Sequence, residues 1–245
     1  MRRHPGRGEA SRQVSGATGR SGRTAGSAAP SPRGAEVGRR IGVGLMNGLW
    51  RPRVLGAGKV PPTGAAILAV NHSHLLDGPM IMGVSPRPTH FLIKKEAFVG
   101  PLDPFLRGIG QVAVDRSGTD RKAVTDALGV LAAGGVLGIF PEGTRGEGDF
   151  ASLRAGLAYF AVRSGAPVVP VAVLGSAEKR GRLIPGLPPL RHRVDVLFGD
   201  PFDAGDGSGR RTRAALDEAT VRIQERLAAH LEKARRLTGR RVTLE

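Results

Sequence analysis

Six short apolar runs recur along this chain, and stretches with helical patterns lie between them. The runs are four to seven residues long, which suits buried strands better than helices. They cover residues 65–70, 90–93, 111–114, 136–140, 168–174 and 194–198, with helix candidates at 78–84, 101–108, 120–133 and 151–164. A length of 245 residues allows one large domain or two small ones. We predict a single layered α/β domain with a largely parallel central sheet flanked by helices.

The two ends of the chain differ from this core. Residues 1–38 are rich in Arg, Gly, Ser and Ala and contain almost no large apolar residue, so we predict a disordered basic tail. A start codon assigned too far upstream would give the same composition. We place the domain at 39–208. Residues 209–245 are predicted to be a basic helix that packs on the domain or extends it.

Positive charge is concentrated at these ends. Of the formal net charge of +16, residues 1–40 carry +7 and residues 209–245 carry +5, as expected for arms attracted to an anionic lipid surface or to nucleic acid. Eight Phe, one Tyr and one Trp are too few to suggest base-stacking platforms, so we expect no nucleic-acid partner. The absence of cysteine excludes disulfides, thiolate metal sites and a cysteine nucleophile.

Two observations concern membranes. No apolar run approaches the roughly 18 residues that cross a bilayer, and the first forty residues contain no continuous apolar segment of the kind found in a signal peptide. The segment 39–50 is apolar, flanked by arginines and ends in a Trp. It could lie in a membrane interface, or it could be an ordinary amphipathic helix on the domain.

A polar cluster, Asn71-His72-Ser73-His74-Leu75-Leu76-Asp77, directly follows the first apolar run. Chemistry in an open α/β sheet is usually located where a strand ends. Histidine is a suitable general base near neutral pH, and Asp77 could hold its ring about one helical turn away. The ordinary alternative is a histidine in a helix cap. His72, His74 and Asp77 could also hold a metal, but no further ligand is placed to complete the shell, so we predict no metal.

Further polar groups follow the later apolar runs. Lys94 and Lys95 end one predicted strand, Arg116 follows another, and Pro141-Glu142-Gly143-Thr144-Arg145 follows a third. Because the carboxyl ends of parallel strands share one crevice, these cations are expected to converge there and to suit a phosphate. Taken singly, the lysines could be solvated, Asp115-Arg116 a surface pair, and the glycine segment a simple turn.

Together these blocks resemble the glycerolipid acyltransferases, and in particular the bacterial 1-acyl-glycerol-3-phosphate acyltransferases. The resemblance covers about residues 58–176 and rests on His72 with Asp77, a Lys-x-Glu, the strand leading to Arg116, Phe140-Pro-Glu-Gly-Thr-Arg145 and a Val-Pro strand. It implies the fold predicted above. Two positions depart from the family pattern, His74 where Ser is frequent and Ala113 where a bulky residue is usual, and both could alter the preference for an acceptor.

The resemblance also implies roles for individual residues. His72 would be the general base for the acceptor hydroxyl, and Asp77 would orient it. Lys94, Arg116 and Arg145 would hold the acceptor's phosphate, while Glu142, Gly143 and Thr144 shape the same site. Pro170 belongs to a block assigned to acyl-donor binding or to packing near it. The implied reaction needs no cofactor and no covalent enzyme intermediate, and its co-substrate is acyl-CoA or acyl carrier protein.

The expected function is transfer of a fatty acyl group to 1-acyl-glycerol 3-phosphate, giving phosphatidate in phospholipid biosynthesis. The expected partners are a lysophospholipid, the acyl donor and an anionic membrane surface, with the protein peripheral on the cytoplasmic face of the cell membrane. Alternative acceptors are glycerol 3-phosphate, another lysophospholipid or an alcohol. A second class of function is a non-catalytic protein that binds anionic surfaces through its basic ends.

Overall fold

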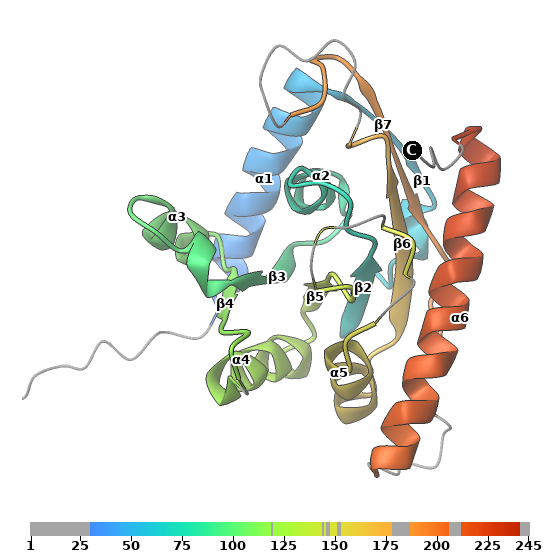
Figure 1. The fold of residues 1–245 in the computed structure, drawn as a ribbon. Helices are drawn as coiled ribbons and strands as arrows, with labels where there is room; N and C mark the ends of the chain where they lie inside the picture. Colours follow the sequence, from blue (N-terminus) through green and yellow to red (C-terminus); the bar gives the residue numbers. More distant parts are fainter. Residues whose placement is uncertain are drawn as a thin grey trace, which may run out of the picture.

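A computed structural model describes residues 30–118, 120–143, 145, 148–150, 153–177, 187–205 and 212–240. Figure 1 shows a central sheet with helices on both sides. The strands are β1 (Arg51–Leu55), β2 (Ala66–Val70), β3 (Thr89–Lys94), β4 (Val112–Val114), β5 (Val136–Ile139), β6 (Val168–Leu174) and β7 (Arg193–Phe198). The helices are α1 (Pro32–Leu49), α2 (Asp77–Val84), α3 (Leu102–Gly108), α4 (Arg121–Ala132), α5 (Gly156–Ser164) and α6 (Arg213–Thr238), with short 3₁₀ turns η1 (Ala57–Lys59) and η2 (Lys95–Ala97).

The seven strands form one sheet in the order β1-β7-β6-β2-β5-β3-β4. Strands β6, β2, β5, β3 and β4 run parallel, whereas β7 is antiparallel to β6 and pairs in parallel with β1. The predicted fold class is therefore confirmed. Because five strands run the same way, the segments that follow them emerge at one edge of the sheet, where a site in an open α/β fold is expected.

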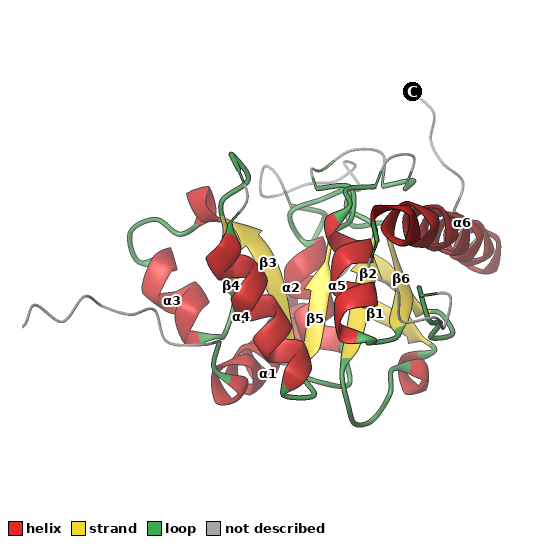
Figure 2. Ribbon diagram, turned by 90° about the horizontal axis from the view of Figure 1, so that it is seen from below, coloured by secondary structure: helices red, strands yellow, loops and turns green. Residues whose placement is uncertain are grey.

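Helices cover both faces of this sheet. Helices α4, α5 and α6 lie over one face, and α1 and α2 lie over the other (Figures 1 and 2). Every residue of β2 is buried, as expected for a central parallel strand covered on both sides. In α6, Ile223, Leu227 and Leu231 are buried against this domain, so the C-terminal helix packs on it. Within the described ranges, every helix is too short or too polar to cross a bilayer.

Helix α1 begins earlier than the sequence suggested. It starts at Pro32, inside the predicted tail of residues 1–38, and the hydroxyl of Ser31 caps it by accepting a hydrogen bond from the Gly34 amide. Residues 1–29 lie outside the described residues. The glycines that weaken a helix prediction here have a packing role. A Cβ on Gly42 would lie 2.8 Å from the Gly83 amide nitrogen in α2, so only glycine permits this approach.

Strand β1 is absent from the predicted elements. Its sequence, Arg-Pro-Arg-Val-Leu, contains only a short apolar stretch and a proline, which cannot donate a backbone hydrogen bond. This sequence can still form a strand because β1 lies at the edge of the sheet and pairs only with β7. An edge strand has one unpaired side, where proline and charged side chains are tolerated.

Candidate active site

His72 and Asp77 meet where β2 ends. The Nδ1 atom of His72 lies 3.2 Å from Oδ2 of Asp77, as the sequence predicted. The aspartate is fully buried and is the first residue of α2, where the helix dipole favours a negative charge. An ionised carboxylate can only accept, so Nδ1 carries the proton and Nε2 presents a lone pair. His72 remains 17% exposed at its side chain and can meet a substrate.

The surrounding chain fixes the carboxylate of Asp77. Its Oδ2 atom also accepts the backbone N–H groups of Ser73 at 2.9 Å and His74 at 2.7 Å. Its Oδ1 atom accepts the hydroxyl of Ser176, at 2.5 Å, from the turn after β6. These donors satisfy both oxygens of a buried charge, which would otherwise be costly to desolvate.

Two further residues set the position of His72. The side chain of Asn71 forms a pair of hydrogen bonds with the backbone of Val173, which ties the start of the loop to β6. The imidazole stacks on the ring of Phe140, with centroids 4.1 Å apart and planes 25° apart. Phe140 stacks in turn on Phe91. The imidazole plane is therefore held by packing on one side and by Asp77 at its edge.

Glu142 lies beneath this loop. Burial raises the pKa of its carboxyl to about 7, although backbone N–H groups of His72 and Phe150 oppose the rise. Its Oε1 atom is buried and has no hydrogen-bond partner among the described residues. The sequence predicted that Glu142 shapes the phosphate site; the structure places it against the backbone of the candidate base.

The raised pKa of Glu142 predicts a pH-dependent stability. The folded protein holds this proton up to about pH 7, whereas an unfolded chain releases it near 4.5, so folding loses stability as pH rises between these values. We expect Glu142→Gln to flatten the fall in the melting temperature between pH 5 and pH 8, measured by calorimetry. Glu96→Gln, at an exposed position, is the control. Identical pH dependence in wild type and Glu142→Gln would contradict the assignment.

Two arginines come together at Gly143. The guanidinium of Arg116 donates a hydrogen bond to the Gly143 carbonyl from the end of β4. The side chain of Arg154 also packs on this glycine, where an added Cβ would overlap its Nε. Gly143 also has a φ of +75°, which favours glycine. Burial lowers the pKa of Arg116, and the neighbouring charge of Arg154 lowers it further.

Among the described residues, neither arginine has a carboxylate within ion-pair distance. The aspartate next to Arg116 in the sequence, Asp115, pairs instead with Lys95. Two like charges held close together repel, and an anion between them would relieve the repulsion. The sequence reasoning missed Arg154 because its importance comes from the fold of the loop around Gly143.

These arginines border a cavity of about 410 Å³. It lies between helices α4 and α5 and the ends of β3, β4 and β5, and its lining is largely apolar. The apolar residues are Leu92, Val114, Ala123, Val124, Ile139, Phe140, Leu157 and Phe160, and the charged ones are Asp115, Arg116, Asp120 and Arg154. Phe140 is shared, because it lines the cavity and also stacks on His72. Cavity and dyad are thus neighbours.

The remaining predicted residues have varied positions. Lys94 ends β3 and is exposed, and Arg145 is exposed; within the described ranges neither forms a hydrogen bond or ion pair with Arg116 or Arg154, so their phosphate role stays a prediction. Thr144 lies outside the described residues. Pro170 is buried within β6, opposite Ala69 of β2, and its carbonyl accepts the Gly199 amide. It packs in the sheet, at the point where pairing with β7 begins.

The alternative that His72, His74 and Asp77 hold a metal ion is not supported by a complete set of ligands among the described residues. Within the described ranges, no group of three or more His, Asp, Glu or Cys side chains is arranged to hold a metal ion. Nδ1 of His74 accepts the Leu76 amide, while both oxygens of Asp77 are engaged by donors as described above.

The chain is similar to several known proteins. Of the curated relatives, a 1-acyl-sn-glycerol-3-phosphate acyltransferase of Bacillus subtilis is 26% identical over 170 residues, which are 69% of this chain and 82% of the relative. An uncharacterised protein of Mycobacterium tuberculosis is 33% identical over 165 residues, 62% of this chain but only 44% of that protein. Among solved structures, the 1-acyl-sn-glycerophosphate acyltransferase PlsC of Thermotoga maritima has the same fold, with a TM-score of 0.58 and 24% identity, covering 82% of this chain and 78% of the other.

The family match spans the elements that build the site. The model of the Acyltransferase family matches residues 51–174, which begin with β1 and end with β6. This range contains the His72–Asp77 dyad, the Gly143 turn and both arginines. The chain therefore belongs to the Acyltransferase family.

Proposed function

We propose that this protein transfers a fatty acyl group from acyl-CoA or acyl carrier protein to the free hydroxyl of 1-acyl-glycerol 3-phosphate, giving phosphatidate. One observation carries the proposal: a His–Asp dyad and an arginine pair lie at the same edge of the sheet, linked by Phe140 and the Gly143 turn. The B. subtilis relative, named for this reaction, supports the choice of acceptor.

The proposed reaction needs only proton transfer and positioning from the protein. Nε2 of His72 removes the hydroxyl proton of the acceptor, and the resulting oxygen attacks the thioester carbonyl. When the tetrahedral intermediate collapses, the C–S bond breaks and the thiolate leaves with the proton that His72 had taken. Asp77 stabilises the imidazolium in between. Arg116 and Arg154 fix the acceptor through its phosphate, which converts an encounter into an oriented complex.

The cavity favours an acceptor that already carries an acyl chain. Its walls are apolar, while its charged residues are gathered near Arg116 and Arg154. A lysophospholipid combines an apolar tail with an anionic head and matches both parts, whereas glycerol 3-phosphate matches only the charged part.

A panel of acceptors tests the proposal. Purified protein is mixed with a radiolabelled acyl thioester and, in separate reactions, with lysophosphatidate, lysophosphatidylcholine, glycerol 3-phosphate or monoacylglycerol. We expect the highest kcat/KM with lysophosphatidate. Preference for another acceptor would contradict lysophosphatidate as the substrate but would leave acyl transfer as the reaction. No transfer to any acceptor, together with steeply salt-dependent binding to DNA, would favour the non-catalytic alternative.

We further propose that α1 places the enzyme on an anionic membrane surface. Its glycine face packs on the domain, so Val37, Ile41, Leu45 and Leu49, spaced four residues apart, point outward and are 39 to 52% exposed. Leu102 and Phe105 of the adjacent α3 are also exposed. Apolar side chains of this kind can enter the acyl region of a bilayer, and nearby cations can meet lipid phosphates.

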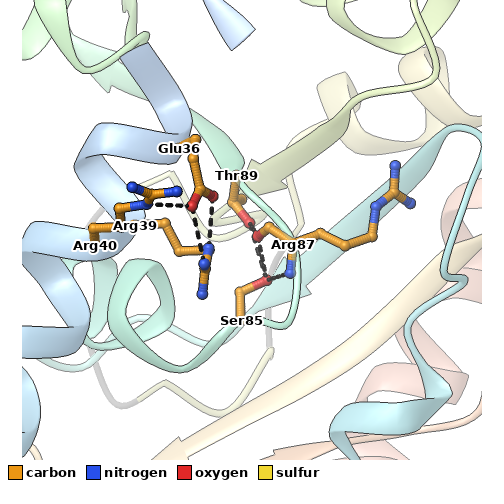
Figure 3. A network of polar contacts seen from close by, with 6 residues as sticks. All are labelled: Glu36, Arg39, Arg40, Ser85, Arg87 and Thr89. Carbon is orange, nitrogen blue, oxygen red and sulfur yellow. Dashed lines mark hydrogen bonds and ion pairs between the residues drawn. The ribbon is translucent and has the colours of Figure 1, made fainter. Parts of the chain in front are cut away.

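Charge on α1 supports the same partner. Figure 3 shows Glu36, its one acid, between Arg39 and Arg40. Hydrogen bonds from Arg39 and then Arg40 lower the pKa of this carboxyl to about 2, so it stays ionised and neutralises part of the arginine charge. Arg33 adds a further exposed cation, which leaves the helix positive overall.

The expected result for the double change Ile41→Ser and Leu45→Ser is weaker membrane binding. Loss of two apolar contacts of about 1.5 kcal/mol each should lower partitioning to vesicles containing anionic lipid by about two orders of magnitude. Co-sedimentation with phosphatidylglycerol vesicles measures this, and Val221→Ser, an exposed apolar position on α6, is the control. Unchanged binding of the double variant would remove α1 from the proposed membrane surface.

A further inference from the structure

The turn after β6 supplies a part of the dyad that the sequence analysis did not identify. Ser176 is fully buried, and its hydroxyl donates to Oδ1 of Asp77 at 2.5 Å. Among the described residues it is the one donor to that oxygen, whereas Oδ2 is shared by three donors including His72. Ser176 and Asp77 are 99 residues apart, so only the sheet brings them together.

The geometry gives this hydroxyl an orienting function. A carboxylate can rotate about its Cβ–Cγ bond, and a donor on only one oxygen leaves that rotation less restricted. The Ser176 hydroxyl holds Oδ1, and thereby keeps Oδ2 directed at Nδ1 of His72. Since a hydrogen bond to a charged group is about twice as strong as a neutral one, this contact is well suited to setting the carboxylate plane.

The turn itself is held by the C-terminal helix. Arg240, just beyond α6, packs on Gly175, where an added Cβ would overlap the guanidinium carbon. Arg240 also donates to Oδ2 of the fully buried Asp195 at 2.7 Å and to the Arg193 carbonyl at 2.6 Å. Arg53 of β1 donates to the other oxygen of Asp195. Arg240 is therefore anchored to β7, the strand next to the edge strand β1, while it lies against the residue before Ser176.

We infer that Ser176 is a positioning residue for the His72–Asp77 dyad, and that Arg240 holds the turn that carries it. The C-terminal helix is thereby part of the support of the active site, although it lies outside the part of the chain that the family model matches. The inference rests on the proposed acyl transfer, because the dyad must act on a substrate for its positioning to be measurable.

The test compares kcat and KM of Ser176 and Arg240 variants with wild type on lysophosphatidate. Ser176→Ala should lower kcat about tenfold to a hundredfold with KM nearly unchanged, since a lost hydrogen bond to a charged group affects the base and leaves the phosphate contacts in place. Ser176→Thr, which keeps the hydroxyl, should recover most of the activity. Arg240→Ala should lower kcat about threefold, and Arg236→Ala, an exposed arginine in the last turn of α6, should have no effect.

A double-mutant cycle separates positioning from general damage. If Ser176 acts through Asp77, adding Ser176→Ala to Asp77→Ala should cause little further loss. Full activity of Ser176→Ala, or a loss that is equal in both backgrounds, would overturn the inference. Should Ser176→Ala fail to fold, Ser176→Cys replaces it in the cycle, because its thiol is similar in size to the hydroxyl and is only a weak donor. A wild-type enzyme without acyl transfer would instead refute the proposed function.

Discussion

Replacing His72 by alanine is expected to lower kcat about a thousandfold or more. A positioned general base contributes roughly 10² to 10⁴ in rate, and the structure offers His72 as the base because Nδ1 is held by Asp77 while Nε2 is free to accept a proton. The measurement is steady-state transfer from a labelled acyl thioester to lysophosphatidate. KM for the acceptor should change little, since its phosphate contacts lie at Arg116 and Arg154.

Two matched variants test whether the lost activity comes from misfolding or from the missing imidazole. His72→Phe keeps an aromatic ring to stack on Phe140 but removes both nitrogens, so it should be as inactive as the alanine variant and retain a melting temperature close to that of wild type. His74→Ala removes a neighbouring imidazole whose Nδ1 faces the Leu76 amide, and should lose only a few-fold in kcat. A folded and active His72→Phe enzyme would exclude His72 as the base.

Replacing Arg116 by alanine is expected to raise KM for lysophosphatidate about tenfold to a hundredfold. A charge-assisted hydrogen bond contributes about 1.5–3 kcal/mol, and Arg116 is one of the two arginines at Gly143, neither of which has a carboxylate partner among the described residues. Monoacylglycerol, which has no phosphate, is the informative comparison, since its KM should hardly change. Arg154→Ala should behave in the same way, and Lys94→Ala, at an exposed lysine, should have the smaller effect.

The comparison of acceptors also tests a structural explanation. Arg116 donates to the Gly143 carbonyl, so its removal could loosen the turn without any role in phosphate binding. In that case activity would fall equally with lysophosphatidate and monoacylglycerol. Such a result would contradict the proposed phosphate contact and leave Arg116 as a support of the Gly143 turn.

Local sequence patterns were enough to predict the frame of the domain and its dyad. Short apolar runs identified β2 through β7, because strands in a covered parallel sheet are apolar throughout. His72 and Asp77 were found together since only four residues lie between them and one loop joins them. The start of α1 was placed too late because the stretch around Gly34 and Gly38 has the composition of a flexible tail, whereas both glycines are buried in the helix and face Gly108 and Ile109.

The missing parts of the site depend on contacts between distant segments. Arg154 has no distinctive local pattern, and only the fold of the loop places it on Gly143. Ser176 reaches Asp77 across the β2–β6 pairing. Asp115, adjacent to Arg116, was considered as its partner, yet the β3–β4 register brings Lys95 to it instead. Which side chains become partners across a sheet depends on the strand register, and a single sequence does not show that register.

A crystal structure of the enzyme with lysophosphatidate bound, in the absence of an acyl donor, tests the central claim most directly. The claim is that one substrate joins the arginine pair to the candidate base. We predict that the phosphate lies within hydrogen-bond distance of Arg116 and Arg154, while the free glycerol hydroxyl lies about 3 Å from Nε2 of His72. A phosphate bound away from both arginines, or a hydroxyl directed away from the imidazole, would contradict it.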